Sequence, residues 1–100
     1  MRVIALSTLR KFLESKSEYA NAKSPLESWY REAKQAQWFS PADVKEQYCN
    51  ASILKSSRVV FNIAGNKYRL VVQINFAVQV IYIRFIGTHK QYDKIDPETV

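Results

Sequence analysis

The stretch T-H-K-Q-Y-D, from Thr88 to Asp93, combines groups that can move protons with groups that can hold phosphate. His89 is the only histidine of the chain. An imidazole can take or give a proton near neutral pH, and a lysine ammonium group is a point charge that binds phosphate. Acid–base chemistry at a phosphate is therefore one interpretation of this stretch. An ordinary helix start at the protein surface is the other.

Cleavage of RNA without a metal needs a base for the ribose 2′-OH, cations for the charge that develops at phosphorus, and an acid for the leaving 5′-oxygen. His89 could be the base or the acid, and Tyr92 could stack on a nucleobase or donate a proton. Arg69, Arg84 and Lys90 could hold the phosphate. We therefore predict a catalytic group made of these five residues.

Residues 88–91 have the S/T-x-x-E/Q form of a capping box. Thr88 is then the cap of a helix that begins at His89, and Gly87 ends the strand before it. On this helix His89, Tyr92 and Asp93 share one side. The free N–H groups at the start of a helix favour an anion.

Three strands are expected between residues 58 and 86, where apolar and polar side chains alternate. Gly65-Asn66 is a two-residue hairpin loop. A first hairpin centred on this loop pairs Asn62 with Arg69 and gives a continuous apolar face, so the turn and the pattern agree.

A second hairpin centred on Ala77-Val78 pairs Leu70 with Phe85 and places Arg84 opposite Val71. Arg69 and Arg84 then become diagonal neighbours, on the order of 7–8 Å apart, on the polar face of the sheet. The face is expected to carry Arg58, Asn62, Lys67, Arg69, Gln73, Asn75, Tyr82 and Arg84. It could bind phosphate, or it could be the solvent-facing side that ordinary alternation produces.

Helices are expected before these strands, and a short strand at residues 2–6 before the helices. Ser7 can cap a helix that runs to about residue 17. S-P-L-E at 24–27 and S-P-A-D at 40–43 can start helices that run to about residues 38 and 48. The fold class is therefore α+β: a twisted, mainly antiparallel sheet with N-terminal helices packed on one face. We expect a single domain over residues 1–100.

The composition favours an anionic partner, because the formal charge is +6 and the sequence pI is about 9.6. Nucleic acid, an acidic protein and an anionic membrane all remain open on charge alone. Cys49 is the only cysteine, so no disulfide can form within the chain. The chain has too few Cys and His residues for a zinc site, and it has neither a phosphate loop of the GxxxxGK type nor a GxGxxG motif.

We expect no targeting or membrane segment. The apolar run near residue 1 is too short for a signal peptide, and polar residues interrupt residues 70–86 with a two-residue rhythm.

Two stretches resemble the HigB branch of the RelE/ParE toxin superfamily: V-F-N-I-A-G-N-K-Y-R-L-V-V-Q-I-N-F at 60–76 and I-Y-I-R-F-I-G-T-H-K-Q-Y-D-K-I-D at 81–96. The motifs are F-N-x-x-G-N-x-Y-R and I-R-x-x-x-T-H-x-x-Y-D. They cover roughly a third of the chain, and the N-terminal half is similar more loosely.

The resemblance implies a RelE-like fold and a small cytoplasmic toxin that enters the ribosomal A site and cuts translated mRNA without a cofactor. It implies a helix-turn-helix antitoxin as partner, with operator DNA bound only through that antitoxin. By position it implies a site of Arg69, Arg84, His89, Lys90 and Tyr92. We expect RNA contacts from Arg31, Lys34, Arg58, Asn62, Asn66, Lys67 and Lys94.

A second hypothesis stays open at this point. One branch of the superfamily poisons DNA gyrase without cutting RNA, and a common fold does not fix a function. The alternative is therefore a nucleic-acid-binding or gyrase-inhibiting toxin without catalytic turnover.

Overall fold

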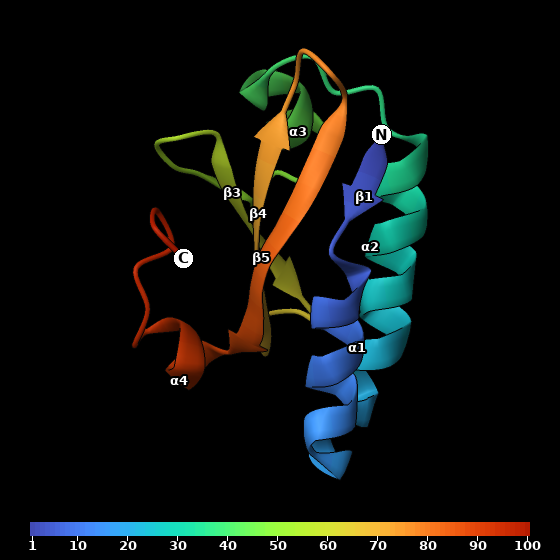
Figure 1. The fold of residues 1–100 in the computed structure, drawn as a ribbon, viewed down its shortest axis with the longest axis vertical. Helices are drawn as coiled ribbons and strands as arrows, with labels where there is room; N and C mark the ends of the chain where they lie inside the picture. The colour runs from blue at the N-terminus through green and yellow to red at the C-terminus, as the bar shows by residue number, and fades with distance from the viewer.

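A five-stranded open sheet, with helices packed against one of its faces, forms the protein in a computed structural model that describes residues 1–100 (Figure 1). The strand order is β1-β5-β4-β3-β2, and every neighbouring pair is antiparallel except β1 with β5. The α+β fold class predicted from the sequence is confirmed. The strands are β1 (Arg2–Ile4), β2 (Ser52–Ile53), β3 (Arg58–Ile63), β4 (Tyr68–Asn75) and β5 (Val80–Thr88).

The first two helices begin at other residues than the capping patterns predicted. Helix α1 (Leu6–Ser15) follows Ala5, whose φ of 72° turns the chain, so Ser7 lies inside the helix and does not cap it. A 3₁₀ helix, η1 (Ser17–Ala22), leads directly into α2 (Lys23–Gln35). The S-P-L-E box is therefore internal, because the preceding turn already supplies the helix start. Helix α3 (Pro41–Gln47) begins at its proline as predicted.

The core lies between the helices and one face of the sheet, and its main cluster has 20 buried residues. Leu26, Trp29 and Ala33 on α2 recur at helical spacing and face the sheet. At the end of the sheet where β5 finishes, Phe12 stacks on Tyr19 with ring centroids 4.4 Å apart, and Tyr68 meets both rings edge-on. This aromatic group fixes η1 against β4.

The first hairpin has the predicted register. Asn62 pairs with Arg69, and Ile63 pairs with Tyr68. The amide of Lys67 donates to the carbonyl oxygen of Ala64 at 3.4 Å across the loop, in which Gly65 has a φ of +69°. A glycine at this point accepts the left-handed backbone without strain.

The second hairpin contains a β-bulge that the sequence pattern did not predict. Val72 pairs with Ile83 as expected, but Val71 pairs with Phe85, which leaves Arg84 as an extra residue. The predicted pairs of Leu70 with Phe85 and of Val71 with Arg84 are therefore wrong. A bulge shifts the alternation of inward and outward side chains by one residue. Arg84 and Phe85 therefore both lie outside the core face, and Ile86 occupies the core position that was predicted for Phe85.

The other face of the sheet is partly covered by the segment that follows helix α4 (His89–Tyr92). This segment runs on the side of the sheet opposite α1 and α2 (Figure 1). Val60 and Val71, which belong to that face, are 3% and 0% exposed. Arg58 is only 8% exposed and donates through Nη1 to the carbonyl oxygen of Val100. The prediction of a solvent-facing Arg58 is therefore wrong.

None of the helices combines the length and the apolar composition that a membrane-spanning helix needs.

Candidate active site

Helix α4 begins with the predicted capping box. The amide of Gln91 donates to Thr88 Oγ1 at 3.2 Å, and the amide of Thr88 donates to Gln91 Oε1 at 2.8 Å. Strand β5 runs on to Thr88 and does not end at Gly87 as expected. The helix has only four residues, so its macrodipole adds little to anion binding. Its effect is to fix the direction in which His89 leaves the strand.

His89 is exposed and has one polar partner. Its Nδ1 lies 3.3 Å from Asp93 Oδ2, one helical turn further on, as the predicted shared side requires. The carboxylate can hold the ring in one orientation and leave Nε2 free to face a ligand. This arrangement suits a group that transfers a proton.

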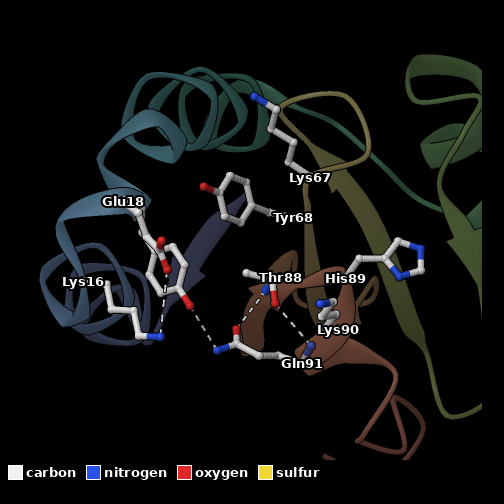
Figure 2. A pocket seen from close by; sticks show the side chains of 9 residues that line it. Lys16, Glu18, Lys67, Tyr68, Thr88, His89, Lys90 and Gln91 are labelled. Atoms are coloured by element: carbon white, nitrogen blue, oxygen red, sulfur yellow. Dashed lines mark hydrogen bonds and ion pairs between the residues drawn. The ribbon is translucent and has the colours of Figure 1, made fainter.

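A hollow of about 600 Å³ opens beside His89, between the end of α1, η1 and the ends of β4 and β5 (Figure 2). Figure 2 shows the His89 ring at the rim, directed away from Lys16. The predicted residues Lys67, His89 and Lys90 meet here. The remaining lining residues are Lys16, Glu18, Tyr19, Tyr68, Thr88 and Gln91.

Arg69 lies at the same end of the sheet as this hollow. It is half-buried on β4 opposite Gly87, two residues before His89 along β5. Its Nη1 donates to the carbonyl oxygen of Asn66 at 3.3 Å. The space beside Gly87 is filled by the Phe85 ring, because a Cβ at Gly87 would lie 2.5 Å from Phe85 Cζ. Arg69 therefore lies beside the last residues of β5, which lead into His89.

Arg84 lies further along the sheet. Its Nη2 donates to Gln73 Oε1 at 2.7 Å, and its guanidinium lies 5.6 Å from the centre of the Tyr82 ring. Gln73 lies toward the opposite end of β4 from Arg69, and together with Tyr82 it lines a separate hollow of about 510 Å³. The prediction that Arg69 and Arg84 are diagonal neighbours is wrong, because the bulge moves Arg84 out of register.

The buried Arg58 is unsuited to hold RNA. Its Nε has no hydrogen-bond partner. The pKa of Arg58 is lowered, mainly by burial and to a smaller extent by the positive charge of Arg84, while the negative charge of Asp96 opposes this shift.

Asn62 is half-buried and lines a third hollow next to Tyr48. The hydroxyl of Tyr48 donates to Glu32. Burial, and then this hydrogen bond, raise the pKa of Tyr48, so its phenol stays protonated at neutral pH. The single O–H of Tyr48 is already donated to Glu32, so it is not free to donate to a ligand beside Asn62.

The other predicted residues, the catalytic Tyr92 and the remaining RNA-binding residues, divide into two groups. Asn66 is exposed on the β3–β4 turn, and Tyr92 and Lys94 lie on and just after α4, close to His89. Arg31 and Lys34 are exposed on α2, in the helical layer. Arg31 donates to Ser28 Oγ at 3.3 Å, and Lys34 lies 5.4 Å from the centre of the Tyr30 ring. The structure does not bring these last two to the site.

Six lining residues of the hollow were not predicted as site residues, and three of them, Lys16, Tyr19 and Gln91, shape it most. Lys16 and Tyr19 follow the end of α1, where no periodic pattern places them. Gln91 was recognised only as part of a capping box. Its Nε2 also meets the hydroxyl of Tyr19 at 3.3 Å, and this contact joins α4 to η1.

The fold and the site together define a small basic α+β protein with a histidine and several lysines gathered at one end of an open sheet. The chain belongs to the HigB toxin family. Residues 22–95 match the family described as HigB_toxin, the RelE-like toxic component of a toxin–antitoxin system. Membership of this family implies an antitoxin as partner.

Curated relatives agree with this assignment. The chain is 28% identical over 86 residues to the mRNA interferase HigB of Escherichia coli O6:H1 (strain CFT073), covering 84% of each protein. It is 50% identical over 34 residues to the mRNA interferase toxin HigB of Escherichia coli K12, covering 34% of this chain and 33% of that protein.

Proposed function

We propose that this protein is the toxin of a type II toxin–antitoxin pair and an endoribonuclease that cleaves translated mRNA on the ribosome without a metal. The observation that carries the proposal is the meeting of His89, Lys67 and Lys90 at one hollow, with Arg69 at the same end of the sheet. The relatives named as mRNA interferases support the same activity.

The proposed roles follow from position. His89 transfers a proton, with Asp93 orienting its ring. Arg69 and Lys90 stabilise the charge that develops on the phosphate. Tyr92 stacks on a base or donates a proton from the same helix. Arg84 binds the RNA backbone further along the sheet, because it lies with Gln73 and not with His89.

The proposed partners are the ribosomal A site, mRNA and a helix-turn-helix antitoxin, with operator DNA bound only through that antitoxin. The proposed location is the cytoplasm, where ribosomes translate. We also propose that the 100 residues act as one domain.

The decisive experiment incubates purified protein with ribosomes and a defined mRNA and maps the cuts. Codon-positioned cuts are expected. Intact mRNA, together with stalled DNA replication in cells, would refute the proposal and favour a gyrase-inhibiting toxin.

The role of His89 is tested by single-turnover cleavage with His89→Gln. The variant should fold and bind ribosomes, but cleave roughly 10²–10⁴-fold more slowly, the usual contribution of a general acid or base. An unchanged rate would remove histidine from the mechanism. A loss of only a few-fold, with Lys90→Ala or Tyr92→Phe inactive, would make His89 a positioning residue and assign the proton transfers to Lys90 or Tyr92.

A further inference from the structure

The hollow beside His89 extends beyond the residues that the family motifs contain. Three lysines border it, and they come from three separate parts of the chain: Lys16 at the end of α1, Lys67 on the β3–β4 turn and Lys90 on α4 (Figure 2). Glu18 is the one carboxylate among the lining residues. The hollow is therefore a cationic site that only the tertiary structure assembles.

The position of Lys16 is fixed by the packing around it. Helix α1 ends at Ser15, and η1 folds back so that Tyr19 stacks on Phe12. Tyr19 and Tyr68 are 6% and 5% exposed, so their packed side chains form the rigid base of the hollow. The contact of Gln91 with the Tyr19 hydroxyl connects the base of the hollow to α4. The backbone of Lys16 therefore has a fixed position relative to His89.

The lysine itself is free to exchange its partner. Lys16 Nζ lies 3.9 Å from Glu18 Oε1, and the two side chains are 62% and 69% exposed. An exposed pair at this distance is weak and is screened by salt. A phosphate that enters the hollow can replace the carboxylate as the partner of Lys16.

We propose that this hollow binds the phosphates of a single-stranded RNA segment adjacent to the bond that is cut, with Lys16 as a phosphate-binding residue. The proposal rests on the proposed function for its ligand, RNA, and for the position of that RNA next to the cut, whereas the phosphate-binding role of Lys16 does not depend on cleavage. The His89 ring points away from Lys16 (Figure 2), and Arg69 and Arg84 lie outside the core face of the sheet. The hollow therefore receives the nucleotides on one side of the cut. The RNA footprint is therefore longer than the two nucleotides that flank the bond.

The test compares two pairs of variants with equal changes in net charge. Lys16→Gln is matched by Lys11→Gln, and Glu18→Gln is matched by Glu14→Gln. Lys11 and Glu14 are exposed on α1 and do not line the hollow. The probe is a six-nucleotide RNA with 2′-O-methyl groups, which cannot be cut, and its binding to the isolated protein is measured by fluorescence anisotropy at several salt concentrations.

Lys16→Gln should weaken binding by about threefold to tenfold at low salt, and should reduce the magnitude of the log–log salt slope by about 0.7, the amount expected for one lost contact with a single strand. Glu18→Gln should tighten binding. Both control variants should bind like the unchanged protein. Equal effects of Lys16→Gln and Lys11→Gln would overturn the proposal, and so would the absence of RNA binding by the unchanged protein in 50 mM salt.

Cleavage on programmed ribosomes, measured in parallel, separates this proposal from the proposed function. If the unchanged protein cuts mRNA but Lys16→Gln and Lys11→Gln bind RNA alike, the phosphate site is refuted and the nuclease stands. If the unchanged protein does not cut mRNA but Lys16→Gln alone weakens RNA binding, the nuclease is refuted and the site stands.

Discussion

Gly87→Ala tests the junction between strand β5 and helix α4. A Cβ at this position would lie 2.5 Å from Phe85 Cζ and 2.8 Å from Gln91 Oε1, whereas ordinary contacts are 3.4–4 Å. The partly buried Phe85 ring must therefore move by about 1 Å, which costs about 1–1.5 kcal/mol if the side chain leaves its rotamer. Gln91 must give up the amide of Thr88, and a lost helix cap costs about 1 kcal/mol.

The expected loss of about 2–3 kcal/mol should lower Tm by roughly 10–20 °C in a chain of this size. Thermal unfolding followed by circular dichroism measures it. Cleavage at a temperature where the variant is folded should also fall, on the order of 10²-fold, because His89 follows the displaced cap.

The other glycine supplies the control. Nothing lies within 4 Å of a Cβ at Gly65, but its φ is +69°, so Gly65→Ala should lose about 1–2 kcal/mol to backbone strain alone. Gly65→Asn should recover most of this lost stability, because asparagine accepts the left-handed region. Gly87→Asn, in contrast, should be less stable than Gly87→Ala. Adding Phe85→Ala to Gly87→Ala should return part of the stability. A Tm for Gly87→Ala within about 2 °C of the unchanged protein would contradict the placement of Phe85 and Gln91.

Four further outcomes are expected. Arg69→Ala should keep the fold and lose about 2–4 kcal/mol of transition-state stabilisation. Arg84→Ala should reduce the single-turnover cleavage rate less than Arg69→Ala does, because Arg84 lies away from His89. A reduction equal to or larger than that of Arg69→Ala would contradict this placement. Arg58→Met should leave the free energy of unfolding in urea unchanged or raise it by up to about 4 kcal/mol, because it replaces a buried charge that has one unpaired nitrogen. A large decrease would show that the contact of Arg58 with Val100 stabilises the fold. Ribosome binding in a pelleting assay should weaken steeply between 50 and 200 mM salt, with Lys67 and Lys90 as contributors; a flat response would count against an RNA partner.

The sequence by itself determined the features that depend on neighbours along the chain. Alternation and the Gly65-Asn66 loop defined the register of the first hairpin, because a two-residue turn leaves one pairing that keeps the apolar face continuous. The pattern from Thr88 to Gln91 defined the capping box, since both of its hydrogen bonds are local. His89 and Asp93 were expected on one side of the helix for the same reason.

Only the tertiary structure decided which of these residues meet. The bulge at Arg84 has no signature in a strand without glycine or proline at that point, and it separates Arg84 from Arg69 while it turns Phe85 to the outer face. Arg58 is buried by a segment 42 residues away in sequence, so alternation alone made it look solvent-facing. Lys16 reaches the hollow because Tyr19 stacks on Phe12 and meets Gln91, and contacts over such a separation leave no periodic pattern in the sequence.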